Sequence, residues 1–304
     1  MSTAKVKKRS VRHSEKRERL IFHLMLLPGM IVLALFVFVP LVGSLMAFQN
    51  YKIGLGLFRS EWVGLENYRI IFTFPDSVQV FWNTLVIAFG KLVLNAIIPV
   101  AFSILLNELG GKIFKRAFQT VVYLPHFLSW VVLATVVTNM FSLDGPINSF
   151  LGLFGIEGIQ FLADNSWFRT VIIGTDVWKE FGYNSVIYLA ALLSIDPGLY
   201  EAASIDGAGR FQKLLHVTLP GIMPTIITML ILRIGNLMSI GYEKTILLYN
   251  PSTYDTADII SSYVYRVGLL EQGWSYSTAI GLFNLILLVL ANKLSKKLAD
   301  TSLW

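Results

Sequence analysis

The chain has 304 residues, of which 55% are hydrophobic and 14% are charged, with a net charge of +6 and no cysteine. A mean hydropathy of +0.63 and so few charged residues exclude an ordinary soluble domain, in which about 25% of residues are charged. Without cysteine, disulfides and thiolate metal sites are excluded as well.

Residues 1–20 form a basic arm in which eight residues are Lys or Arg. We predict that this arm is cytoplasmic and contacts anionic lipid head groups rather than nucleic acid. The apolar run that follows is about twice as long as the core of a cleavable signal peptide, and no small-residue cleavage site closes it. We therefore expect the run to be a membrane anchor.

Six apolar runs are long enough to cross a bilayer as helices, which takes about 20 residues each. They lie at 21–48, 79–107, 114–142, 168–194, 218–241 and 275–295. These runs predict an all-α polytopic membrane protein, with one six-helix domain over 21–298 and a short tail at 299–304. The composition is typical of a protein of the bacterial plasma membrane.

The Lys and Arg residues predict how the chain is oriented in the membrane. Sixteen lie in the basic arm, the second and fourth loops and the tail, whereas five lie in the first, third and fifth loops. Because Lys and Arg concentrate in cytoplasmic loops, both termini and the fourth loop are predicted to be cytoplasmic.

The fourth apolar run contains polar residues at i+3 and i+4 spacing, which places them on one helix face. They are Asp176, Lys179, Glu180, Tyr183 and Asn184. Two interpretations stay open: a wet translocation path for sugars, or internal ion pairing of Lys179 with Asp176 or Glu180. The candidate path residues are Trp178, Glu180, Tyr183, Asn184 and Tyr188. In the fifth run, Arg233 is expected to pair with a carboxylate.

The loop at 196–220 is charged and interrupted by glycine, unlike an ordinary connection between spans. Asp196 and Pro197 are suited to the N-cap and first position of a helix. Gly207 then interrupts the helical pattern, which resumes before Pro220. The pattern predicts two short helices joined at Gly207 and placed to dock on a cytoplasmic partner.

Sequence signatures of catalysis are missing from the chain. It contains no GxxxxGK[ST] nucleotide loop, no HExxH zinc motif and no GxSxG nucleophile elbow. We therefore expect no catalytic residue, no metal site and no cofactor bound by this chain.

The loop also carries a resemblance to a known family. Glu201-Ala202-Ala203, then Gly207, then Val217, Leu219 and Pro220 are similar to the signature EAA-x3-G-x9-I-x-LP of ABC importer permeases, with Val217 in place of isoleucine. Asp206-Gly207-Ala208 is similar to the form found in sugar importers. Further similar stretches are LLPG at 26–29, YLPHFLSW at 123–130, WKEFGYNSVIYLAAL at 178–192, and Leu303-Trp304. Together they resemble the oligosaccharide/polysaccharide branch of these permeases.

The resemblance implies a type I importer permease fold, in which a five-helix core follows an additional N-terminal span. It implies that the loop is a coupling helix seated in a groove of a cytoplasmic ATPase. The implied coupling residues are Glu201, Ala202, Ala203, Asp206, Gly207, Ala208, Phe211 and Pro220.

The implied partners are a second, homologous permease in a heterodimer, two cytoplasmic ABC ATPase subunits that use ATP and Mg, and an extracytoplasmic substrate-binding (lipo)protein. The chain would then be the non-catalytic permease subunit of an ATP-driven importer of an oligosaccharide or polysaccharide.

Two alternatives stay open. An ion-gradient-coupled secondary sugar transporter could use Asp176, Lys179 and Glu180 as a relay, but it leaves the EAA spacing unexplained. A membrane-embedded enzyme acting on lipid or glycan could use Asp176 and Glu180, but no second catalytic element accompanies them.

Overall fold

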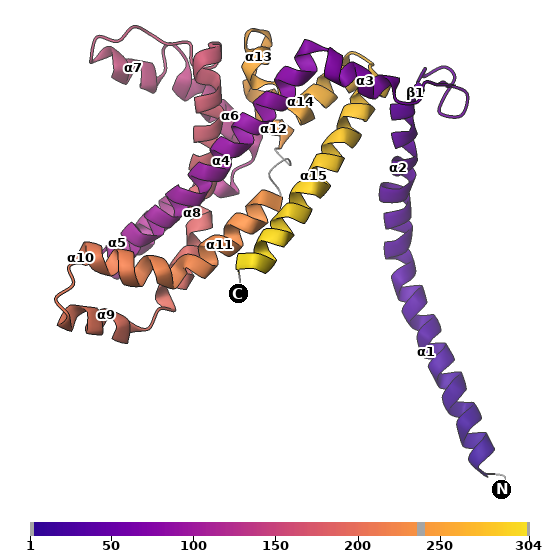
Figure 1. The fold of residues 1–304 in the computed structure, drawn as a ribbon, viewed down its shortest axis with the longest axis horizontal. Coiled ribbons are helices and arrows are strands. Elements are labelled where there is room, and N and C mark those ends of the chain that lie inside the picture. Colours follow the sequence, from indigo (N-terminus) through magenta and orange to yellow (C-terminus); the bar gives the residue numbers. More distant parts are fainter. Residues whose placement is uncertain (1–2, 236–240, 303–304) are drawn as a thin grey trace.

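The computed structural model describes the backbone of residues 3–235 and 241–302, and side chains over 18–111, 113–234, 241–294 and 296–297. Within these ranges the chain is mostly helical (Figure 1), which confirms the predicted fold class. The helices are α1 (Thr3–Leu33), α2 (Val39–Gly43), α3 (Glu66–Thr73), α4 (Pro75–Glu108), α5 (Lys112–Phe127), α6 (Trp130–Phe141), α7 (Pro146–Gly152), α8 (Asn165–Leu193), α9 (Pro197–Ile205), α10 (Arg210–Lys213), α11 (Leu219–Gly235), α12 (Tyr242–Leu248), α13 (Tyr254–Ala257), α14 (Ile260–Tyr265) and α15 (Trp274–Ser302). Two short strands, β1 (Gln49–Asn50) and β2 (Glu61–Trp62), pair antiparallel. We call the end that carries α3 and α13 the upper end, and the end that carries α9 the lower end, as in Figure 1.

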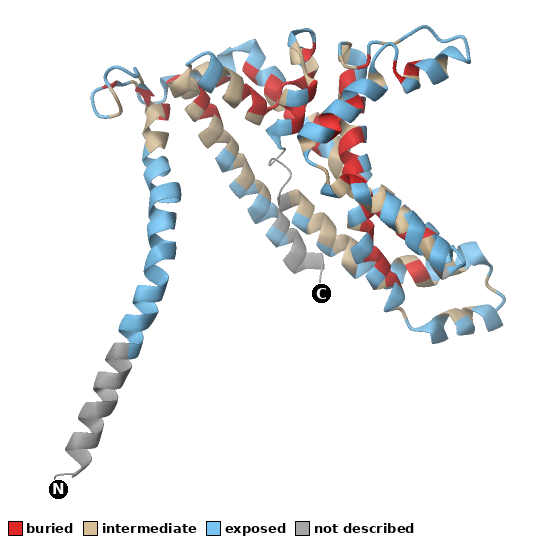
Figure 2. Ribbon diagram, turned by 180° about the vertical axis from the view of Figure 1, so that it is seen from behind, coloured by how far each residue is buried: buried red, intermediate tan, exposed pale blue. Residues whose placement is uncertain are grey.

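The N-terminal helix stands apart from the rest of the molecule (Figures 1 and 2). It runs from α1 through a π-helical segment, α2 and a 3-10 segment to Phe48. The apolar window in its candidate span, Glu18–Phe48, is not buried at all. Only its upper end joins the core, where Ala47 packs in a cluster with Ile71 and Ile280. The exposed apolar surface must therefore be covered by lipid or by another subunit.

Among the residues that the structure describes, five helices are long and apolar enough to cross a membrane, and a sixth span results if α8 and α9, which meet at a bend of 66°, are counted together. The five are Glu18–Phe48, Pro75–Glu108, Trp130–Gly152, Arg210–Ile234 and Trp274–Leu294. The third predicted span, at 114–142, is not a single helix, because the helix is interrupted at Leu128 and Ser129. The side chain of Ser129 caps the new helix by accepting a hydrogen bond from Val132 N. The end of the predicted fifth span, 236–240, lies outside the described residues.

The central packing is between α8 and its neighbours α4, α5 and α11. Lipid chains are as apolar as these side chains, so helix association in a membrane depends on close van der Waals contact and hydrogen bonds. Gly182 illustrates the close contact, because a Cβ there would collide with the carbonyl oxygen of Val122 on α5. The buried residues accordingly lie along α4, α8 and the short upper helices (Figure 2).

A short helix, α12, lies in contact with α6, α8 and α14. It is seven residues long, so it cannot cross a membrane by itself. Its buried face includes Lys244, Thr245 and Leu248. This helix therefore brings a lysine into the packed part of the bundle.

Candidate functional site

The loop at the lower end forms the two short helices that its sequence predicts. Asp196 caps α9, because its Oδ1 accepts a hydrogen bond of 2.9 Å from Gly198 N, and Pro197 occupies the first helical position. Gly207 ends the helix with a φ of 78°, a left-handed conformation that favours glycine. The turn is closed by a hydrogen bond of 2.9 Å from Ala208 N to Ala203 O. The predicted turn at Gly207 is therefore confirmed.

The loop presents an exposed surface that is partly apolar. Of the eight coupling residues suggested by the resemblance, six are exposed and two are half-buried. Glu201, Ala202, Asp206 and Phe211 are exposed side chains, and Ala203 and Ala208 are half-buried. Gly207 is exposed in the turn, and Pro220 is exposed in the first turn of α11.

Sequence reasoning missed two large apolar side chains on the same loop. Ile205 is 87% exposed and Leu199 is 54% exposed, beside Phe211 at 70%. The sequence could have indicated them, because Leu199 and Ile205 are large apolar residues in an otherwise polar segment. Exposed apolar side chains grouped in this way indicate a surface for a partner.

The other side of the loop is attached to the bundle. The hydroxyl groups of Tyr200 and Thr218 are hydrogen-bonded at 3.0 Å, and Lys213 Nζ donates to Ser204 Oγ at 2.6 Å. The two short helices are thus tied to each other and to the residue just before α11. A force applied to the exposed surface would be transmitted into that span.

Asp176 is the centre of a buried ion cluster in α8. Its carboxylate contacts the ammonium groups of Lys91 on α4, at 3.0 Å, and of Lys244 on α12. The side chains of Lys244 and Asp176 are 2% and 10% exposed, and that of Lys91 is 21% exposed. Two cations therefore share one anion and join three elements of the bundle. Sequence reasoning found Asp176 but not its partners.

Lys179 holds the interruption between α5 and α6. Its buried ammonium donates hydrogen bonds to the carbonyl oxygens of Pro125, His126 and Leu128, at 3.3, 2.7 and 2.8 Å. Carbonyl groups at a helix end lack partners within the helix, so the lysine replaces what the broken helix has lost. The predicted pairing of Lys179 with Asp176 or Glu180 is wrong, because neither pair is found among the ion pairs of the described side chains.

Glu180 and Tyr183, two predicted path residues, are brought together by a histidine that the prediction left out. His126 Nδ1 lies 2.9 Å from a carboxylate oxygen of Glu180. The imidazole stacks on the ring of Tyr183, with centroids 3.9 Å apart and an angle of 1° between the rings. One face of Tyr183 is therefore covered by His126. The signal in the sequence was a histidine inside an apolar run.

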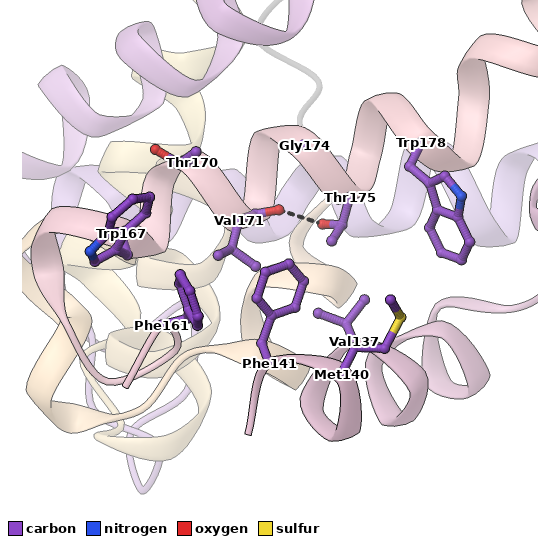
Figure 3. Close-up of a pocket in the computed structure, with 10 residues that line it drawn as sticks. All are labelled: Val137, Met140, Phe141, Phe161, Trp167, Thr170, Val171, Gly174, Thr175 and Trp178. Atoms are coloured by element: carbon purple, nitrogen blue, oxygen red, sulfur yellow. Dashed lines mark hydrogen bonds between the residues drawn. The ribbon is translucent and has the colours of Figure 1, made fainter. Parts of the chain in front are cut away.

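The other predicted path residues lie elsewhere. Trp178 lines a cavity of about 370 Å³ between α6 and α8, whose wall is almost entirely apolar and includes Trp167 and Phe141 (Figure 3). Tyr188 is 1% exposed and packs in a separate core cluster. Asn184 is half-buried. The five predicted residues therefore do not form one continuous surface.

Arg233, for which the sequence predicted a carboxylate partner, is instead hydrogen-bonded to Tyr188. A phenol is a neutral partner, so this contact does not balance the charge of the guanidinium. Among the described residues, no group of three His, Asp or Glu side chains is placed to hold a metal ion.

Comparison with known proteins gives consistent matches. Residues 98–300 match the family model described as "Binding-protein-dependent transport system inner membrane component". The chain is 41% identical to the polygalacturonan/rhamnogalacturonan transport system permease protein YteP of Bacillus subtilis (strain 168), over 95% of this chain and 94% of that protein.

Two solved structures are also similar, each with a TM-score of 0.81 and 36% sequence identity. One is a bacterial ABC transporter involved in the import of the acidic polysaccharide alginate, and the match covers 95% of this chain and 99% of that chain. The other is a bacterial alginate ABC transporter in complex with an alginate pentasaccharide-bound periplasmic protein, with coverage of 93% and 94%.

Proposed function

The chain belongs to the family of binding-protein-dependent transport system inner membrane components, and we propose that it is the permease subunit of an ATP-driven importer of an oligosaccharide or polysaccharide. The observation that carries the proposal is the exposed, partly apolar loop at 196–220, which combines the EAA spacing with rigid attachment to α11. The names of the similar proteins support a saccharide as the substrate class.

The proposed assembly contains a second, homologous permease, two cytoplasmic ATPase subunits and an extracytoplasmic binding protein that delivers the saccharide. In it, both termini and the lower end of this chain face the cytoplasm, consistent with the excess of Lys and Arg in those segments. ATP and Mg are used by the ATPase subunits, and this chain binds neither. Its own contributions are half of the translocation path and the coupling loop.

The coupling loop docks through both its apolar and its charged residues. Ile205 and Phe211 enter a groove of the ATPase, while Glu201 makes a polar or ionic contact at its edge. Ala202, Ala203 and Ala208 permit close approach because their side chains are small. When the ATPase subunits close on ATP, movement of the loop passes through Thr218 and Pro220 into α11 and opens the path toward the binding protein.

The saccharide passes residues of α8. Trp178 and Tyr183 offer aromatic faces to the apolar faces of sugar rings, and Glu180 and Asn184 offer hydrogen bonds to hydroxyl groups. Tyr188 is buried, so it acts indirectly, through its hydrogen bond to Arg233.

Co-purification from the native membrane in a mild detergent tests this proposal. The wild-type chain should bring down a second permease and an ATPase whose hydrolysis is stimulated by a saccharide-loaded binding protein. Ile205→Ser should reduce recovery of the ATPase about tenfold, because loss of one central apolar contact costs about 1–2 kcal/mol. The matched control is Ile53→Ser, at a residue 72% exposed near the upper end, which should have no effect.

Isolation of the chain without any ATPase, together with uptake that is abolished by dissipating the ion gradient, would instead support the secondary transporter. Equal recovery of the ATPase with wild type and Ile205→Ser would exclude Ile205 from the docking surface.

A further inference from the structure

The ion cluster in the middle of the bundle contains two lysine side chains for one carboxylate. The carboxylate of Asp176 faces two ammonium groups, those of Lys91 and Lys244. The carboxylate of Glu180 on the same helix as Asp176 is held by His126, and no ion pair of the described side chains joins Glu180 to Lys91 or Lys244. Ionisable groups are costly inside a membrane, and such groups commonly mark the path of a charged substrate.

Of the two lysines, Lys91 is the one that a substrate can reach. Its side chain is 21% exposed, whereas that of Lys244 is 2% exposed. Lys91 lies near the middle of α4, too far from either end for its ammonium group to reach a lipid head-group region. Because an ammonium group is not stable against acyl chains, its open side must face polar space inside the transporter.

Another cation, Arg233, lies on α11 beside a more distant part of α8. Arg233 is hydrogen-bonded to Tyr188, which is about 18 Å from Asp176 along α8 at a rise of 1.5 Å per residue. Positive groups therefore occur at two depths beside α8. Such a series suits a substrate that carries negative charges at intervals along its length.

We propose that Lys91 is a specificity-determining residue that binds the carboxylate of an acidic, uronate-containing saccharide as it crosses the membrane. The inference rests on the proposed function as a saccharide permease. The incoming carboxylate would share Lys91 with Asp176, and the new contact would be a charge-assisted hydrogen bond. A neutral saccharide has no carboxylate with which to make this contact.

The test uses the complete importer in vesicles, with its partner permease, its ATPase and its binding protein. The probes are galacturonate and mannuronate trisaccharides and the carboxyl-reduced, neutral form of each. The readout is saccharide imported per ATP hydrolysed, which separates a defect in passage from a defect in assembly. Lys91→Gln is compared with Lys91→Arg, which keeps the charge, and with Lys293→Gln, at an exposed lysine near the end of α15.

The wild type should import a uronate trisaccharide in preference to its neutral form. Lys91→Gln should lower uronate imported per ATP by about tenfold or more, the effect of losing one charged hydrogen bond, while stimulated ATP hydrolysis stays within about twofold. Lys91→Arg should restore most of the import, and Lys293→Gln should match the wild type.

The inference would be overturned if the wild type imported only neutral saccharides, if Lys91→Gln left import unchanged, or if import and ATP hydrolysis fell together. A wild-type complex that imported no saccharide at all would instead count against the proposed function itself.

Discussion

A single backbone conformation sets the angle between the two short helices of the coupling loop. Gly207 adopts a φ of 78°, and no atom lies close enough to crowd a side chain at this position. The requirement for glycine is therefore one of backbone strain rather than of space. Since Glu201 lies before the turn and Phe211 after it, this angle decides how the two residues reach the ATPase together.

We expect Gly207→Ala to lower saccharide uptake and stimulated ATP hydrolysis while leaving the bundle folded. An alanine in this conformation costs about 1–2 kcal/mol, and the loop can avoid that cost by changing its angle. The control is Gly209→Ala, where φ is −70° and an alanine fits. The measurements are uptake by the complex and the thermal unfolding midpoint of the purified chain. Equal uptake by the two variants would show that the turn geometry is unimportant for coupling.

At the scale of elements, α8 organises the bundle because it contacts α4, α5, α11 and α12. Its residues make contacts of several kinds. Gly182 allows α5 to approach, Asp176 pairs with lysines of α4 and α12, and Lys179 caps the end of α5. The interruption of the third predicted span is stable because α8 supplies the hydrogen bonds that the interruption removes.

Gly182→Ala should destabilise the bundle by about 1–3 kcal/mol, the usual cost of forcing an extra carbon into a packed contact. Gly174→Ala is a matched control on the same helix, since nothing lies near the position of its Cβ. It should be neutral or stabilise the chain by up to about 1 kcal/mol, because alanine favours the helix. The two variants are solubilised in detergent and heated, and the fraction that remains monomeric is measured at each temperature. The midpoint temperatures of the two variants are then compared. A lower midpoint for Gly174→Ala than for Gly182→Ala would contradict the packing argument.

At the scale of the whole molecule, the two ends of the bundle have different tasks. The lower end carries the coupling loop, and the upper end carries the β-hairpin and the short helices α12, α13 and α14 (Figure 1). The distribution of Lys and Arg predicts that the lower end is cytoplasmic. The N-terminal helix stands apart, and no part of its apolar window is buried. We therefore expect lipid or a second permease to cover this helix.

The orientation can be tested directly because the chain has no cysteine. Phe58 and Phe211 are 90% and 70% exposed and lie at opposite ends, so Phe58→Cys and Phe211→Cys form a matched pair. The test uses cells whose plasma membrane is intact and whose cell wall or outer membrane has been removed. In these cells a membrane-impermeant maleimide should label the Phe58→Cys chain only. After the membrane is permeabilised, both variants should be labelled. The reverse pattern would place the coupling loop outside and exclude a cytoplasmic ATPase as its partner.

The features that the sequence alone determined are local ones. The apolar runs predicted a bundle of membrane-spanning helices, because crossing a bilayer requires a certain length of apolar helix, and the described residues contain five or six candidate spans. The cap at Asp196 and Pro197 and the turn at Gly207 were predictable because each depends on neighbouring residues. The EAA spacing likewise lies within one loop.

Only the tertiary structure decided which polar groups meet inside the bundle. Asp176 and Lys244 are 68 residues apart, and Lys179 and Pro125 are 54 apart, so no local pattern could pair them. The sequence placed Lys179 beside two carboxylates, yet it binds backbone carbonyls that become available only because the third span is broken. A buried charge takes whichever partner the packed helices bring within reach, and that choice is made by the fold as a whole.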